Sequence, residues 1–268
     1  MKKTAFMIVY NDVDYVDYAI RSVKDWVDEL IIVEGAFEIT MKTGKPPRSD
    51  DGTLDIIHQH VDNKRVFLKQ ANLREHKHHY DIGYQYAIEN GSDWAILVDS
   101  DEVWTPQSKA VAENNMQMYL KKGSGWGGGD IKEMRIKEYC FINDFKTYYK
   151  GTYPRFFKCL KGSKFVFDNE VQFAGYRRGE HGIFTSGDAH PKVFHYGYVR
   201  KKTRWQLKQD YMWEKDHNPN LEKYTLKDDS YVIPEDIPIY SFEGQHPEMM
   251  KDHPFYGKGA HEIIYDED

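Results

Sequence analysis

Two carboxylates stand two residues apart directly after an apolar segment in the first half of the chain. Residues 94–98 read WAILV, and Asp99 and Asp101 follow, separated by Ser100. Carboxylates at this spacing beyond a strand can share one Mg²⁺ or Mn²⁺, because these hard ions prefer oxygen ligands and keep positions open for phosphate oxygens. The alternative interpretation is a solvated acidic turn after an ordinary core strand. We therefore expect either a divalent-metal site or an acidic turn at this position.

A second group of candidate residues lies near residue 200, where a histidine precedes a basic cluster. His195 stands in the apolar run KVFHYGYV, and imidazole is a suitable ligand for Mn²⁺ beside carboxylates. The densest basic cluster of this acidic protein follows, at Arg200, Lys201, Lys202 and Arg204. Guanidinium and ammonium groups bind phosphate oxygens through charge-assisted bonds, which favours a diphosphate clamp. The simpler interpretations are a structural histidine and a solvated helix start.

The first 120 residues alternate between strand-like and helix-like segments. Apolar runs predict four strands, at residues 5–9, 30–33, 66–68 and 94–98. Helical segments begin near Val16 and Leu54, and a third contains Ile82 and ends at Asn90-Gly91. The order βαβαβαβ predicts a doubly wound α/β sheet, whose ligands bind at the carboxyl ends of the strands. The acidic residues after the fourth strand stand at such an end.

Beyond residue 122 the pattern changes to short β-prone segments that predict an added antiparallel layer. These segments are residues 133–142, 146–158 and 163–173. A helical or irregular C-terminal part follows, with a helix expected at 201–215. We expect an α/β half at 1–122 and a second half with a C-terminal extension at 123–268, joined in one domain. Arg155 reads as a surface cation between core aromatics, or alternatively as a group that orients an acceptor or a phosphate.

The charge balance and the cysteine content limit the class of partner. The net charge is −6, so no global positive field exists to hold nucleic acid or an anionic membrane, and any phosphate site must be local. The apolar run near the N-terminus is interrupted at Asn11 and Asp12, so neither a signal peptide nor a membrane span is predicted. Cys140 and Cys159 read as reduced thiols, and we expect a cytoplasmic location.

Three segments in order carry a resemblance to a known family. They are FMIVYNDVDYVDYAIRSV at 6–23, DELIIVEGAF followed by RSDDGTLDII between 28 and 57, and GSDWAILVDSDEVW at 91–104. Together they resemble the GT-A fold glycosyltransferases of the family-two type, over residues 4 to 105. The resemblance implies metal-dependent, inverting transfer of a sugar from a nucleoside diphosphate sugar to a glycan, lipid or other hydroxyl acceptor, with Mn²⁺ or Mg²⁺ as cofactor.

The resemblance also implies that residues 1–122 form a nucleotide-sugar-binding half and residues 123–268 an acceptor-side half. It further implies roles for individual residues. The expected metal ligands are Asp99, Asp101 and His195, with Asp101 also counted as catalytic. The expected nucleotide-sugar contacts are Tyr10, Asn11, Asp12, Glu34, Arg74, His78, Asp99, Ser100, Arg200, Lys202 and Arg204. An inverting transfer needs a carboxylate that takes the proton of the acceptor hydroxyl. Glu170 is the expected base, and Asp168 and Asp188 are the other candidates. The Arg-Asn pair that the family often carries before the metal strand is missing here, so Arg74 or His78 is expected to contact the phosphates.

Two other functions compete with this interpretation. AILVDSDEV also resembles the first motif of haloacid-dehalogenase-like phosphohydrolases, in which Asp99 would be the nucleophile. That motif normally lies near the start of the chain, and the Asp expected after Gly187-Asp188 is missing at the right distance. The second alternative is a protein of the same fold that binds a nucleotide or a glycan without turnover.

Overall fold

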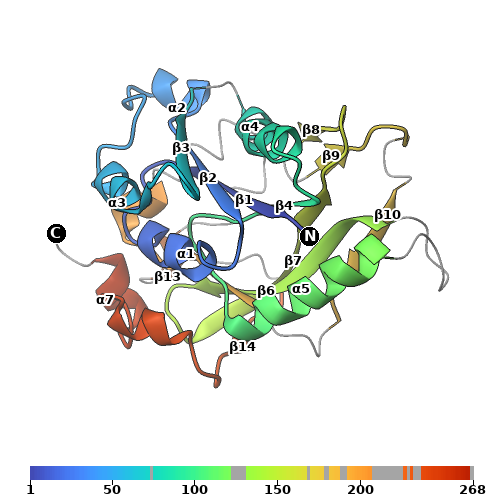
Figure 1. Cartoon of the computed structure of the whole chain (residues 1–268). Coiled ribbons are helices and arrows are strands. Elements are labelled where there is room, and N and C mark those ends of the chain that lie inside the picture. The colour runs from blue at the N-terminus through green and yellow to red at the C-terminus, as the bar shows by residue number, and fades with distance from the viewer. Residues whose placement is uncertain are drawn as a thin grey trace.

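The computed structural model describes residues 1–72, 75–121, 131–167, 170–177, 181–187, 192–206, 226–227, 230–231 and 237–265. The strands of the first half are β1 (Lys3–Val9), β2 (Glu29–Glu34), β3 (Val66–Gln70), β4 (Trp94–Leu97) and β5 (Glu102–Val103). The helices between and after them are α1 (Val16–Val23), α2 (Glu38–Lys42), α3 (Thr53–His60), α4 (His76–Glu89) and α5 (Pro106–Lys121). Figure 1 shows their arrangement.

The second half adds strands and short helices. The long strands are β6 (Ile131–Ile142), β7 (Thr147–Lys158) and β11 (Val193–Tyr198). The shorter ones are β8 (Lys164–Phe167), β9 (Glu170–Gln172), β10 (Gly182–Thr185), β12 (Leu226–Lys227), β13 (Ser230–Tyr231) and β14 (Tyr240–Ser241). Near the C-terminus a 3₁₀ helix spans Glu248–Asp252, and α7 spans Ala260–Ile264. Of the helix expected at 201–215, residues 202–206 are helical, and residues 207–215 lie outside the described part of the chain.

One mixed sheet runs through both halves, in the order β3-β2-β1-β4-β7-β6-β11-β5. Strands β1 to β4 are parallel, whereas β7 pairs antiparallel with β4 and with β6. The predicted α/β fold with a mixed sheet and added antiparallel strands is therefore confirmed. The strands of the second half extend the sheet of the first, and the assignment of the two halves to donor and acceptor stays a prediction.

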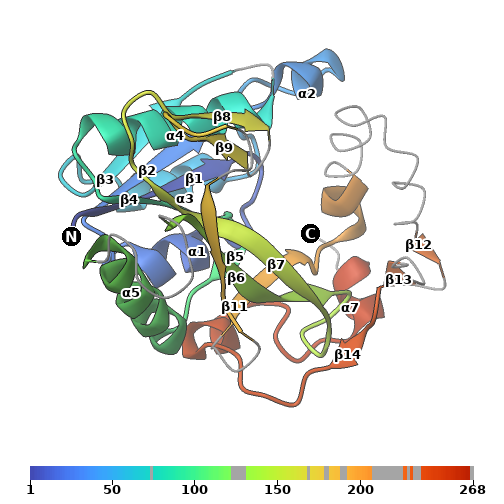
Figure 2. The same cartoon turned by 90° about the vertical axis from the view of Figure 1, so that its right-hand side faces the viewer.

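Helices cover both faces of this sheet, as alternation along the strands requires. Ala5, Met7 and Val9 of β1 point to a core shared with α1, α3 and α5. Phe6 points to the opposite face, into a core shared with α4 and the β8–β9 hairpin. Figure 2 shows α4 with this hairpin on one side of the sheet and α1 with α5 on the other. The four parallel strands are thus anchored from both sides, which fixes the positions of their carboxyl ends.

The contact between α4 and β1 depends on a glycine. A Cβ atom at Gly83 would lie 2.4 Å from Cβ of Phe6, so the helix can approach the strand this closely only without a side chain there. We expect Gly83→Ala to lower the free energy of unfolding by about 1–3 kcal/mol, because overpacking forces the helix away from the sheet. Urea denaturation measures this loss. Glu89→Ala, at an exposed position of the same helix, is the control, and an equal stability of both variants would contradict the prediction.

Among the described residues, no helix has the length and apolar character needed to cross a membrane.

Candidate active site

Two turns that carry carboxylates meet at the carboxyl ends of β1 and β4, where the order of the parallel strands reverses. The strand order β3-β2-β1-β4 reverses between β1 and β4, and in open α/β sheets such a point forms a crevice at the carboxyl ends of the strands. Asp12 follows β1, and Asp99 and Asp101 follow β4. The hydroxyl of Ser100 donates a hydrogen bond to Asp12, which joins the two turns. The sequence prediction that acidic residues stand at this edge is confirmed by their placement.

β11 brings a histidine back to this edge from the second half of the chain. β11 pairs antiparallel with β5, and His195 lies opposite Glu102 in this pairing. Nε2 of His195 lies 3.0 Å from Oδ1 of Asp101, and both side chains are buried. Burial alone would lower the pKa of His195, but the charge and the hydrogen bond of Asp101 outweigh it and raise this pKa well above 6.5. The predicted return of His195 to the acidic motif is therefore present in the structure.

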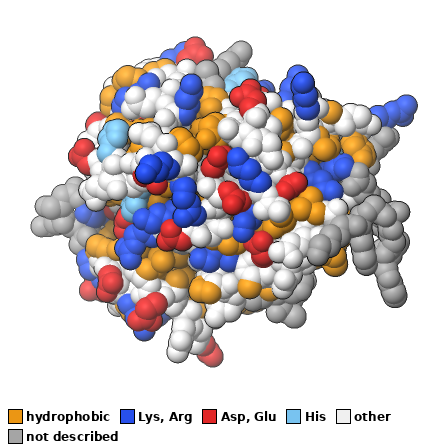
Figure 3. Space-filling model, in the orientation of Figure 1, with side chains coloured by type: hydrophobic (Ala, Val, Ile, Leu, Met, Phe, Trp, Pro, Cys, Tyr) orange, Lys and Arg blue, Asp and Glu red, His pale blue; other side chains and the backbone are white. Residues whose placement is uncertain are grey.

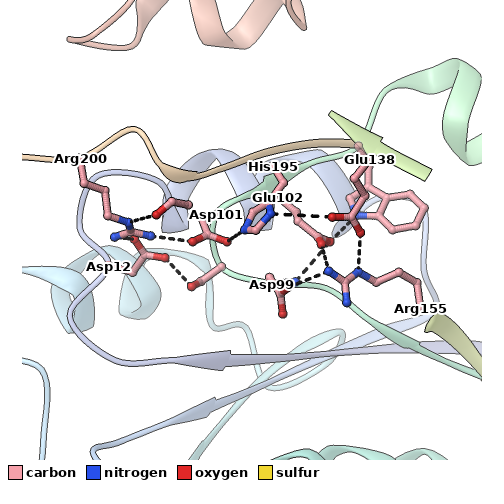
Figure 4. Close-up of polar contacts among 11 residues, drawn as sticks. Asp12, Asp99, Asp101, Glu102, Glu138, Arg155, His195 and Arg200 are labelled. Atoms are coloured by element: carbon pink, nitrogen blue, oxygen red, sulfur yellow. Dashed lines mark hydrogen bonds and ion pairs between the residues drawn. The ribbon is translucent and has the colours of Figure 1, made fainter. Parts of the chain in front are cut away.

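Arg200 forms a buried bridge between the two acidic turns (Figure 4). Its Nη1 donates to Asp12 at 2.7 Å and its Nη2 to Asp101 at 2.6 Å. Its Nε donates to the main-chain oxygen of Gly197 at 2.8 Å. The side chain is 6% exposed, so Arg200 is not a solvated residue at a helix start. It belongs to a buried cluster of charged side chains that includes Asp12, Asp101 and His195.

Arg155 is buried in the same cluster, so its interpretation as a surface cation is wrong. Its Nη2 contacts Asp99 at 2.8 Å and also Glu102, and its Nε lies 3.0 Å from Glu138. Glu102 and Glu138 are fully buried. Burial raises the pKa of Glu102 well above 4.5, although the guanidinium of Arg155 opposes this rise. Burial also raises the pKa of Glu138, again against Arg155. Sequence reasoning gave neither glutamate a role.

A β-bulge explains why Arg155 turns inward. In the antiparallel β6–β7 ladder Met134 pairs with Phe156 and Arg135 with Pro154, so Arg155 is left between two paired residues. A bulge places one extra residue on one strand and re-aims the side chains around it. Residues 154–157 are consequently all buried, whereas a regular strand would alternate. The proline before Arg155 was the available signal, because proline within a strand often marks a bulge.

The donor atoms of the cluster suit a divalent cation. Asp99, Asp101 and His195 each offer one ligand atom, and these atoms lie within 4.8 Å of one another. Carboxylate oxygens with an imidazole are a suitable donor set for Mn²⁺. The cluster is also rich in carboxylates, because five of them lie beside two guanidinium groups and His195. These carboxylates are Asp12, Asp99, Asp101, Glu102 and Glu138. The residues therefore fit a divalent ion, although the oxygens of Asp101 already contact His195 and Arg200.

The loop of residues 46–51 packs against the ends of β1 and β2, on the side where the nucleotide is expected. The amide group of Asn11 exchanges two hydrogen bonds with Asp50, at 2.9 and 3.0 Å, and Asn11 adopts a φ of 49°, which asparagine tolerates better than most residues. Tyr10 donates its hydroxyl to the main-chain oxygen of Pro46 at 2.9 Å, and burial together with nearby acids raises its pKa to about 12. Glu34 is fully buried and accepts the main-chain N–H of Ser49 at 2.8 Å. Nucleotide contacts of Tyr10, Asn11 and Glu34 stay predictions.

The remaining predicted site residues are spread more widely. Arg204 pairs with Asp51 beside this loop, and the ammonium of Lys202 lies 5.7 Å from the ring centre of Tyr265. His78 is exposed in the first turn of α4, and Glu170 begins β9 in the hairpin that packs near α4. The candidates Arg74, Asp168 and Asp188 lie outside the described residues. The structure thus joins Asp12, Asp99, Ser100, Asp101, His195 and Arg200 in one network.

Comparison with known proteins gives only distant similarities. No protein-family model and no curated protein matches the chain. A solved structure of S. aureus TarS, residues 1–349, is 14% identical over 81% of this chain and 66% of its own length, with a TM-score of 0.46. The mannosyltransferase PcManGT from Pyrobaculum calidifontis, in complex with GDP-Man and Mn²⁺, is 12% identical over 78% of this chain and 60% of its own, with a TM-score of 0.44.

A third similar structure is 4-diphosphocytidyl-2C-methyl-D-erythritol synthase from Anaerococcus prevotii. It is 12% identical over 80% of this chain and 96% of its own, with a TM-score of 0.41. The chain spans less than two thirds of the length of the TarS and PcManGT structures. All three TM-scores lie below 0.5, so none of these similarities assigns a ligand or a function to this chain.

Proposed function

We propose that this protein is a glycosyltransferase that moves a sugar from a nucleoside diphosphate sugar to a hydroxyl group of a glycan, lipid or other acceptor. The observation that carries the proposal is the meeting of Asp12, Asp101, His195 and Arg200 at the point where the strand order reverses. Ligands of open α/β sheets bind at this point. The order of motifs in residues 4 to 105, which resembles family-two enzymes, supports the same conclusion.

The proposed reaction assigns a task to each part of the cluster. Asp99, Asp101 and His195 would hold Mn²⁺ or Mg²⁺, which stabilises the negative charge of the departing diphosphate as a Lewis acid. Arg200 stands beside these ligands and contributes positive charge toward phosphate oxygens. Arg155 holds Asp99 in place through its ion pair, whereas Asp101 contacts His195.

Acceptor activation is assigned to a carboxylate of the second half. We propose an inverting transfer in which Glu170 takes the proton of the acceptor hydroxyl as the sugar is transferred, and Asp188 is the alternative base. Lys202 and Arg204 follow Arg200 in the chain, and we propose that they assist in binding the diphosphate.

Nucleotide binding tests this function directly. We expect UDP or GDP with Mn²⁺ to raise the melting temperature, because a ligand at 100 times its dissociation constant stabilises the folded state by about 2.7 kcal/mol. UDP and GDP-mannose are the first probes, since structures similar to this chain contain them. Asp101→Ala should remove the Mn²⁺-dependent part of the shift. The absence of any metal-dependent shift with all nucleoside diphosphates in the wild-type protein would contradict the proposal.

A further inference from the structure

All three nitrogen groups of Arg200 are used by the protein itself. Two of them bind Asp12 and Asp101, and the third binds the main-chain oxygen of Gly197. The guanidinium also lies over the ring of Tyr15, 5.5 Å from its centre. A charge-assisted bond to each of two buried carboxylates is a strong interaction. Arg200 therefore acts as an internal cation of the free protein, placed between the turns after β1 and β4.

This placement puts Arg200 in competition with a metal ion. Oδ2 of Asp101 lies 2.6 Å from Arg200, and Oδ1 lies 3.0 Å from His195. A divalent ion at Asp101 and His195 must therefore bind next to a guanidinium that holds the same carboxylate. Two cations so close repel each other strongly in a site with little water. This repulsion is relieved if the guanidinium gives up its contact with Asp101 and pairs with another anion.

We infer that Arg200 is a positioning residue that couples metal binding to donor binding. When the ion binds, the guanidinium breaks its contact with Asp101 and pairs with the diphosphate of the donor instead. The inference rests on the proposed function, since it takes the ion and the nucleoside diphosphate from there. The fork of a guanidinium matches phosphate oxygens as well as carboxylates, so the exchange keeps Arg200 paired. Coupling of this kind is reciprocal, and the ion strengthens nucleotide binding by the same factor as the nucleotide strengthens ion binding.

Mn²⁺ affinity without nucleotide is the measurement that isolates Arg200. Electron paramagnetic resonance of free Mn²⁺ gives the dissociation constant for the wild-type protein and for Arg200→Met. We expect Arg200→Met to bind Mn²⁺ about ten- to a hundredfold more tightly than the wild type. This factor corresponds to one charge-assisted hydrogen bond to Asp101, which the ion must break in the wild type and which the variant lacks. An unchanged or weaker affinity of Arg200→Met would overturn the inference.

The second arm measures the coupling itself. UDP and GDP, each at saturation, are added to the Mn²⁺ titrations of both proteins. The wild-type protein should gain more Mn²⁺ affinity from a nucleotide than Arg200→Met gains, because only the wild type must release Asp101. Equal gains in the two proteins would overturn the coupling.

Three controls separate the outcomes. Arg21→Met removes a charge from a half-exposed arginine that pairs with Asp17, and it should leave the Mn²⁺ affinity unchanged. Arg200→Lys keeps the charge but replaces the planar fork with a compact ammonium on a flexible stem, which holds Asp101 less firmly, so it should show a smaller gain and serves if Arg200→Met does not fold. Asp101→Asn should weaken Mn²⁺ binding strongly, because Asp99 and His195 are the only donors of the set that stay unchanged. Binding that depends on Asp101 but not on Arg200 overturns only the inference, whereas no Mn²⁺ binding in any variant overturns the proposed metal site as well.

Discussion

Arg155→Met should lower the free energy of unfolding by about 3–5 kcal/mol, the usual cost of removing one partner of a buried ion pair. Methionine keeps most of the length of the side chain but leaves three carboxylates without their guanidinium. Glu102 and Glu138 are fully buried, and Asp99 is partly buried. Neither glutamate can reach water to recover its hydration, so the folded state must either keep a buried charge without its partner or take up a proton, and both cost free energy above the ordinary pKa.

This loss should depend on pH in a defined direction. Burial raises the folded-state pKa of Glu102 above 4.5, and Arg155 limits the rise. Without Arg155 this pKa rises further, so above pH 4.5 the folded variant binds more protons than the unfolded chain. Stability then falls as the pH increases. The difference between variant and wild type should therefore be smallest near pH 4.5 and grow toward neutral and alkaline pH.

Urea denaturation at about pH 5 and pH 8 measures both effects. Arg21→Met is the control, because Arg21 pairs with Asp17 at 3.0 Å at the surface, where the two side chains are 46% and 33% exposed. Exposed ion pairs contribute about 0–1 kcal/mol, so this control should change little at either pH. A loss for Arg155→Met that is as small as that of the control, or that is equal at both pH values, would contradict the assignment of Arg155 as the counter-ion of the glutamates.

The parts of the fold that could be predicted are those with local signals. The four parallel strands appear in the sequence as apolar runs, and the helix after the third strand ends at Asn90 and Gly91 as expected, with Gly91 at a φ of +69°. Asp99 and Asp101 were predictable at a strand end because they follow such a run directly. The placement of His195 on a strand was predictable from its apolar segment, whereas its return to the acidic motif was expected from the resemblance to GT-A enzymes.

The rest of the cluster depends on pairings that the sequence does not express. Glu138 stands in the alternating pattern of a half-exposed strand, and only the pairing of β6 with β11 buries it beside His195. Arg155 turns inward because of the bulge, which depends on the register between β6 and β7. The basic cluster after residue 199 looked uniform in sequence, but the structure separates it. Arg200 is buried in the pairs with Asp12 and Asp101, whereas Arg204 is 22% exposed and pairs with Asp51.

On the face seen in Figure 3, basic and acidic side chains are interspersed, in keeping with the prediction that any phosphate site is local. Positive charge directed at a diphosphate must then come from the residues of the cluster, from a bound divalent ion, or from both. Asp101 affects both of these sources of positive charge, because it contacts His195, a proposed ligand of the ion, and Arg200.

Asp101→Asn should reduce sugar transfer at least about a hundredfold, because a Lewis acid at the diphosphate is worth several kcal/mol in the transition state. Asparagine keeps the shape of the side chain but removes the charge that holds the ion, and it leaves Arg200 with Asp12 as its remaining ionic contact in the network. The loss should be partly recovered at high Mn²⁺ concentration, since the other two donors, Asp99 and His195, stay in place.

The release of UDP or GDP from a donor sugar, measured against Mn²⁺ concentration, gives both the rate at saturation and the apparent metal affinity. Asp25→Asn is the control, because Asp25 is 82% exposed and its substitution removes the same charge from a surface ion pair with Arg65 at 3.9 Å. A fall in rate that no Mn²⁺ concentration improves would place Asp101 outside the metal site. An unchanged rate would refute its part in the reaction altogether. The expected combination, a weaker metal affinity together with a lower rate, arises only if the carboxylate that Arg200 and His195 hold in the free protein is also the one that positions the ion on the diphosphate.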